Sequence, residues 1–221
     1  MTTEIGQSRA RSDAFTKATG KAVFGTDVFL PGMLHARLLR SPVAAGRITV
    51  LDLSKVIEFP GVHGVLTAAD LPDRLSGLVL MDAPLFARDF VKFEGEPIAA
   101  VVAETRAIAK QALDLALLEI KETPSIGSIE ESIAENAPLV HPDWESFASP
   151  PGVEWPRSGN VVAETRSDPE GVDEAFASAT TIVEDQFETG RQYQACMEPR
   201  MAVAEFDGQR FTIHVAHQFP Y

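Results

Sequence analysis

The sequence predicts an α+β fold in which short strands alternate unevenly with short helices. The segment from Phe93 to Ile120 is the most informative, because it reads as a turn, a buried strand, an amphipathic helix and the start of another strand. Ile98–Ala103 is almost wholly apolar, as in a strand that is buried on both faces. The connections between strands differ in length, which favours an α+β domain over a doubly wound parallel sheet.

Local signals define this central element. Gly95 is expected to permit a tight approach of the backbone, and Pro97 opens the extended segment. The hydroxyl of Thr105 can accept a hydrogen bond from a free amide in the first turn of the helix that follows. The apolar residues of that helix recur on one face, as expected for packing against a sheet; they are Ile108, Ala112, Leu115 and Ala116.

The elements before Phe93 follow from apolar runs and turn residues. A flexible lead-in of residues 1–16 is expected first. The pattern then predicts strands at 33–41, 48–53 and 62–67, a short helix at 53–59 that Pro60-Gly61 ends, and a helical turn at 68–71. Residues 72–91 are predicted to be irregular, with their Leu and Phe side chains tucked into a core. Together with the central element, these segments define a domain at residues 17–125.

An acidic, proline-containing linker is predicted at residues 126–158. Residues 119–145 hold seven carboxylates and one lysine, and prolines recur through to Pro156. Such composition is typical of an extended segment between domains.

A second region begins at residue 159 and continues to residue 221. A strand is expected at 161–166, a short helix at 172–179 and a strand at 180–189. Asp207-Gly208 then separates two apolar runs, 201–206 and 210–217, which is a strong hairpin signal. A sheet that ended there would leave an apolar edge unpaired, which isolated domains avoid. We therefore expect the chain to be the leading piece of a larger fold.

Composition limits the class of protein. The chain has 221 residues, of which 45% are hydrophobic and 23% charged, as in a globular protein of one or two domains. No apolar run is long enough to span a bilayer, and the polar start is unlike a secretory signal, so a cytoplasmic protein is expected. The single cysteine, Cys196, excludes an internal disulfide and a four-cysteine metal site within these residues.

Charge is unevenly distributed. The net charge is −13, yet residues 1–50 hold seven Lys/Arg against three Asp/Glu, so they carry +4 and the remainder −17. An acidic surface repels nucleic acid and anionic membranes, and neither is expected as a partner. The basic start has two interpretations, a solvated arm or a segment that lies across a partner subunit, and the solvated arm is favoured.

Few residues suggest chemistry by themselves. Glu94 and Glu96 flank Gly95 and could serve as an acid–base pair, although shaping a loop is the favoured interpretation. The five histidines show no metal-ligand spacing, and no metal site is expected. Cys196 lies among apolar residues and is expected to be an inert buried thiol. Phosphate-binding glycine loops and the serine-hydrolase elbow are absent from the sequence.

Three segments together resemble one family, the molybdopterin-binding large subunits of the xanthine dehydrogenase and aldehyde oxidase group. The similarity covers roughly residues 16–221, and it rests on the order of motifs that are individually weak. The first segment comprises Thr19-Gly20-Lys21-Ala22, Asp27, Leu30–Ala36 (LPGMLHA) and Arg40-Ser41-Pro42. The second is Gly95-Glu96-Pro97 with the strand Ala99–Ala103, and the third is Met197-Glu198-Pro199-Arg200 with Ala202 and His217–Pro220 (HQFP).

The resemblance implies an α/β hammerhead domain up to about residue 125 and the incomplete start of a molybdopterin-binding domain from about residue 159. The implied reaction is hydroxylation of an electron-poor carbon, in N-heterocycles or aldehydes, with oxygen taken from water. The implied cofactor is molybdenum-molybdopterin, with iron–sulfur clusters and FAD on partner subunits or domains. The family's catalytic base is a late glutamate that this chain lacks, so no catalytic residue is assigned here.

One residue is assigned to the cofactor through the resemblance. Gln218 matches a glutamine whose amide donates a hydrogen bond to an oxygen on the metal. The chain departs from the family at His217, where a small residue is usual. Glu198 matches the family's Glu-Pro element and is expected to have a structural role.

Two hypotheses follow. In the first, the chain is the N-terminal part of a molybdenum hydroxylase large subunit. It is inactive alone and works with the remainder of that subunit, an iron–sulfur subunit and an FAD subunit. In the second, it is a non-catalytic module that docks onto such a complex. A free-standing small-molecule binding domain is a third, less favoured interpretation.

Overall fold

The chain divides into two compact units, which are described separately. The computed structural model describes residues 5–77, 79–149, 151–152, 156–165, 167, 169–190 and 192–217. One unit comprises residues 34–182, and the other combines residues 1–33 with residues 183–221. The predicted α+β class is confirmed, since every strand pairing in the described ranges is antiparallel and the helices are short.

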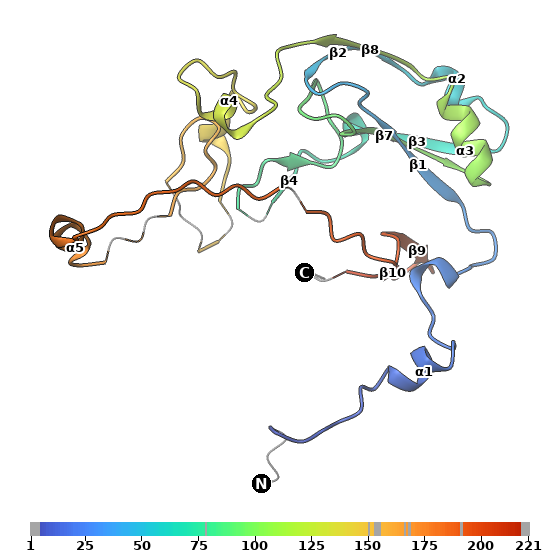
Figure 1. Cartoon of the computed structure of the whole chain (residues 1–221). Coiled ribbons are helices and arrows are strands. Elements are labelled where there is room, and N and C mark those ends of the chain that lie inside the picture. Colours follow the sequence, from blue (N-terminus) through green and yellow to red (C-terminus); the bar gives the residue numbers. More distant parts are fainter. Residues whose placement is uncertain are drawn as a thin grey trace. The chain divides into compact units, whose positions relative to one another are not determined.

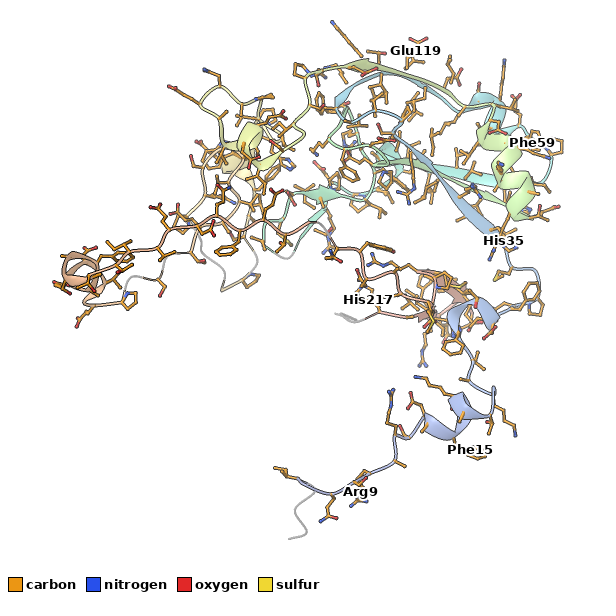
Figure 2. The ribbon with its side chains drawn as sticks, in the orientation of Figure 1. Arg9, Phe15, His35, Phe59, Glu119 and His217 are labelled. Carbon is orange, nitrogen blue, oxygen red and sulfur yellow. The ribbon has the colours of Figure 1, made fainter. Side chains whose placement is uncertain are left out.

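The centre of the 34–182 unit is strand β7 (Pro97–Ala103), which lies between β1 (His35–Arg40) and β3 (Val62–Thr67). Helix α3 (Arg106–Leu113) packs across one face of this sheet, as Figure 1 shows. Val101 and Ala103 of β7 form a buried cluster there with residues of the helices, and Phe59 lies beside it (Figure 2). The strand predicted from its apolar run is thus the middle strand of a sheet.

A second sheet covers part of the opposite face of β7. Its order is β6 (Phe90–Val91), β2 (Gly46–Asp52) and β8 (Leu117–Glu122). Ile98 of β7 is fully buried against apolar side chains of β2 and β8. Gly46 is required at the start of β2, because a Cβ there would lie 2.5 Å from Ile120 Cγ2 and 2.8 Å from the carbonyl oxygen of Lys121.

The local predictions for the central element are mostly confirmed. Thr105 is the N-cap of α3, and its hydroxyl accepts a hydrogen bond from the Ile108 amide at 3.1 Å. The tight backbone approach expected at Gly95 is absent, since nothing lies within 4 Å of where a Cβ would stand. Glycine is required there because φ is +88°, which other residues rarely adopt. Two further elements occupy the expected positions, helix α2 (Ser54–Ile57) and the 3₁₀ turn η2 (Ala68–Asp70).

Residues 72–91 are largely irregular, as predicted, and they contribute to the core. Two-residue strands β4 (Leu75–Ser76) and β5 (Ala83–Pro84) pair within this segment. Several of its apolar side chains are buried, namely Leu80, Phe86, Ala87 and Val91.

The acidic segment of residues 126–158 is more folded than the extended conformation that its prolines predict. It contains helix α4 (Ile129–Ile133) and the 3₁₀ turn η3 (Trp144–Ser146). We call residues 138–149 the cap, because they fold over the loop of residues 80–82. Phe147 of the cap is buried, and the Met81 amide donates to the Ala148 carbonyl at 2.9 Å.

The side chain of Asn160 is hydrogen-bonded to the cap and to the last turn of α4. Its Oδ1 accepts from the Val140 amide at 2.9 Å, while its Nδ2 donates to the carbonyls of Pro138 at 3.0 Å and Ser132 at 3.1 Å. One amide side chain therefore meets three main-chain groups that no helix or strand satisfies.

Two strands predicted beyond the cap are wrong. Residues 162–165 form no strand, and only an isolated bridge joins Ser158 to Val161. Residues 180–189 also form none, and Val183 and Phe187 are 87% and 88% exposed. A strand needs a neighbour for its amides and carbonyls, and no described residue supplies one to the 180–189 segment. The short helix is confirmed as α5 (Val172–Ser178).

The other unit contains helix α1 (Ala14–Ala18), the 3₁₀ turn η1 (Gly25–Asp27) and the predicted hairpin. Strands β9 (Ala202–Phe206) and β10 (Phe211–Val215) pair in register, and the rings of Phe206 and Phe211 stack at 4.4 Å. Among the described residues, no helix has the length and apolar character needed to cross a membrane.

Replacing Ile98 tests the packing of β7 against the second sheet. Ile98→Ala is expected to lower the free energy of unfolding by about 2–5 kcal/mol, because the cavity lies between two rigid layers. Urea unfolding of the whole chain measures this value. The matched control is Leu117→Ala in β8, which is 50% exposed and is expected to cost at most about 0.5 kcal/mol. Equal losses in the two variants would contradict the packing.

Candidate functional site

The turn that contains Glu198 is fixed by the N-terminal segment of the chain. The amide of Gly25 donates to Glu198 Oε1 at 3.0 Å, although the two residues are 173 positions apart. The side chain of Met201 lies against the same glycine, with its Cγ 3.0 Å and its Sδ 3.3 Å from where a Cβ would stand. Glu198 of the third motif therefore contacts the segment between Ala22 and Asp27 of the first motif, and it has the structural role predicted for it.

The hairpin after this turn leads to the predicted cofactor residue. β9 begins at Ala202, β10 ends at Val215, and His217 follows. Gln218, the residue assigned to the cofactor, lies outside the described residues. On the hairpin, His214 Nε2 lies 3.4 Å from Glu205 Oε1, and both side chains are part-exposed.

The Arg-Ser-Pro and Gly-Glu-Pro motifs also contact each other. The Ser41 amide donates to the Glu96 carbonyl at 2.9 Å, and the Gly95 amide donates to the Ser41 carbonyl at 2.8 Å. Arg40 Nη1 donates to the Gly95 carbonyl at 2.7 Å. These bonds join the end of β1 to the start of β7, so both motifs maintain strand register.

Glu94 and Glu96 do not form an acid–base pair. Glu94 is exposed, whereas Glu96 is only 5% exposed and its carboxylate accepts a hydrogen bond from the Lys92 amide. The favoured interpretation, that these residues shape a loop before the strand, holds for Glu96. A buried carboxylate that closes a loop is a structural element.

Cys196 differs from its prediction, because it is exposed and free. The apolar sequence around it suggested burial, yet Met197 is itself 100% exposed. Within the described ranges, no group of three or more His, Cys, Asp or Glu side chains is arranged to hold a metal ion.

The basic start of the chain is partly neutralised within itself. Lys17 Nζ lies 2.7 Å from Asp13 Oδ2, and Arg11 Nη2 lies 3.0 Å from the same oxygen. The hydrogen bonds from Lys17 and then Arg11 lower the pKa of Asp13 to about 2. All three side chains are at least 40% exposed, as in a solvated arm.

One ionisable cluster was missed by sequence reasoning. His141 of the cap lies with its Nε2 3.2 Å from Asp82 Oδ2, and the two side chains are 15% and 28% exposed. The ring meets the ring of Phe147 edge to face, at 4.9 Å and 89°. Burial is the main cause that lowers the pKa of His141, and the charge of Lys92 adds to it. No spacing signal exists for partners that are 59 residues apart in sequence.

Three of the cavities among the described residues of the 34–182 unit lie near the cap or the turn before β7. The largest of these three, about 500 Å³, has Ala68, Arg88, Asp143 and Phe147 among its lining residues. A second of about 310 Å³ is lined mostly by apolar residues, among them Phe93 and Leu139. A third of about 180 Å³ lies beside His141, Trp144 and Arg157. No residue of the β9–β10 hairpin lines any of these three.

Two families match this chain in succession. The model described as aldehyde oxidase and xanthine dehydrogenase, a/b hammerhead domain, matches residues 19–124. The model described as molybdopterin cofactor-binding domain matches residues 155–221. The two matched ranges follow the order in which the motifs occur.

Individual relatives agree with the family matches. The chain is 34% identical to a probable xanthine dehydrogenase component of Bacillus subtilis, over 97% of this chain and 27% of the relative. It is 33% identical to the nicotine 6-hydroxylase large subunit of Paenarthrobacter nicotinovorans, over 98% and 26%. The crystal structure of quinoline 2-oxidoreductase from Pseudomonas putida 86 aligns with a TM-score of 0.80 and 32% identity, over 97% and 27%. The chain therefore spans about a quarter of the length of these relatives.

Removing the Glu198 carboxylate tests the contact between the first and third motifs. Glu198→Ala is expected to speed exchange of the Gly25 amide hydrogen about 5-fold, since one hydrogen bond contributes about 1 kcal/mol. Glu198→Gln keeps an acceptor oxygen and should preserve most of the protection. Hydrogen exchange followed by NMR gives both values, and an unchanged Gly25 rate in Glu198→Ala would contradict the contact.

Proposed function

Because this chain belongs to the xanthine dehydrogenase and aldehyde oxidase family, as the N-terminal portion of a molybdenum hydroxylase large subunit, we propose that it works in an oxidoreductase complex. The complex would oxidise N-heterocycles or aldehydes in the cytoplasm, with water as the source of oxygen. The observation that carries this proposal is the succession of the two family matches across residues 19–124 and 155–221. The relatives named for nicotine and quinoline support N-heterocycles as the first substrates to assay.

The chain is proposed to be inactive by itself. Its coverage of the relatives supports this proposal, because the chain matches only about a quarter of their length. The remainder of a large subunit would complete the pterin pocket and supply the catalytic base. Iron–sulfur clusters and FAD are proposed to reside on partner subunits, where they would receive the electrons that the molybdenum cofactor removes from substrate.

The role of the chain would be to position the cofactor. Glu198 and Gly25 hold the turn before β9, and the hairpin then leads toward Gln218. We propose that the amide of Gln218 would donate a hydrogen bond to an oxygen on the bound metal. A fixed amide orients the centre at little reorganisation cost.

Docking without catalysis is the second candidate. Helix α4 exposes Ile129 and Ile133 by 76% and 64%, and carboxylates surround them. An apolar pair with an acidic rim suits a partner surface that is apolar and basic. In this case the chain would bind the iron–sulfur and FAD subunits and contribute nothing to the molybdenum site.

Purification of the native complex through a tag on this chain separates the candidates. The main proposal expects further polypeptides, molybdenum, iron and flavin in the eluate, and turnover with N-heterocycles or aldehydes. The isolated chain should show no turnover. Iron and flavin without molybdenum would favour docking alone, and elution without any partner or cofactor would contradict both candidates.

Gln218 is tested in the assembled enzyme. Gln218→Ala is expected to lower kcat about 100-fold, by analogy with the loss of one fixed hydrogen-bond donor, while molybdenum content stays near that of the parent. Gln209→Ala, in the exposed hairpin loop, is the matched control and should leave kcat unchanged. An unaltered kcat in Gln218→Ala would remove this residue from the cofactor site.

A further inference from the structure

One titratable ring, that of His141, takes part in the contact between the cap and the 80–82 loop. The loop and the cap share a main-chain hydrogen bond, Met81 to Ala148, and the buried side chains of Leu80 and Phe147. His141 adds the pairing with Asp82 and the edge contact with Phe147. The imidazole therefore touches both sides of this contact.

The hydrogen bonding of His141 suits the neutral ring. When Nε2 carries the hydrogen and donates to Asp82, Nδ1 carries none. Nδ1 is buried and has no hydrogen-bond partner. Protonation would place a second N–H at this position, where no acceptor receives it. An unsatisfied buried donor is costly, and more so when it carries charge.

Other charges face the same ring from each element packed against it. Asp82 belongs to the loop, Asp143 to the cap itself, and Lys92 and Glu96 to the turn before β7. The three carboxylates favour the charged ring, whereas burial and Lys92 oppose it more strongly, so the pKa of His141 falls below 6.5. Arg157, whose Nη2 donates to the Phe147 carbonyl at 2.7 Å, adds a second cation nearby.

We propose that the cap is an acid-released clasp, in which protonation of His141 loosens residues 138–149 from the loop at residues 80–82. Asp143 and Phe147 of the cap form part of the wall of the cavity of about 500 Å³. Release of the cap would therefore remove this part of the cavity wall. This device depends neither on a bound cofactor nor on the assembly proposed above.

The sign of the pH dependence follows from the lowered pKa. An unfolded cap binds the proton more readily than a closed one. The stabilisation from His141 is therefore complete above the unfolded-state pKa, and it is lost as the pH falls through the lower pKa of the closed state. Release is expected below about pH 6.5.

Trp144 offers a direct readout, because it belongs to the cap and lines the cavity beside His141. The chain has two tryptophans, so Trp155→Phe leaves Trp144 as the only indole. In this background, acrylamide quenching of the full chain is measured from pH 7.5 to pH 5. Quenching should rise several-fold, with its midpoint below about pH 6.5.

Three variants in the same background test the assignment. His141→Gln, which does not titrate, should remove the rise. His63→Gln, on β3 and paired with Glu104, should keep it. Asn160→Ala, which loses the fastening of the cap, should give strong quenching at every pH.

Two results of the quenching experiment would overturn the proposal. One is quenching that stays constant or falls as the pH drops, because the ion pair with Asp82 would then dominate. The other is the same rise in His141→Gln as in the parent. Far-UV circular dichroism should be unchanged over this range; a parallel loss of sheet signal in both proteins would likewise overturn the proposal, since acid would then unfold the domain.

Discussion

The burial of β7 on both faces is the constraint on which the larger unit depends. Its backbone is hydrogen-bonded to β1 on one side and β3 on the other. Its side chains alternate between the cluster beneath α3 and the cluster shared with β2 and β8. A polar side chain on either face would enter an apolar layer without a partner, so the strand must be apolar along its length. Both apolar layers pack against this strand.

The sequence motifs form hydrogen bonds with other segments at β7 and before the hairpin. The Arg-Ser-Pro and Gly-Glu-Pro segments are hydrogen-bonded to each other, which fixes the register between β1 and β7. The Glu-Pro segment before β9 is fastened to the N-terminal turn η1. These motif residues therefore have mainly structural roles, because their hydrogen bonds connect segments that are distant in sequence.

Much of this structure could be predicted where the signal is local. The N-cap hydrogen bond of α3 involves only Thr105 and the amide three residues later. The hairpin is predicted by Asp207-Gly208 between two apolar runs. Prediction failed where the outcome depends on distant partners. The alternation at residues 180–189 resembles a strand, but no described neighbour pairs with it. The pairing of His141 with Asp82 could not be predicted, because only the folded chain brings these two residues together.

The central claim is that β7 is the last part of the larger unit to open. Amide hydrogen exchange over the whole chain, read by mass spectrometry or NMR, tests it most directly. The account predicts that the slowest amides are those of residues 98–103, with faster exchange in the cap and fastest exchange at residues 180–190. Slower exchange in the cap or in β2 than in β7 would contradict it.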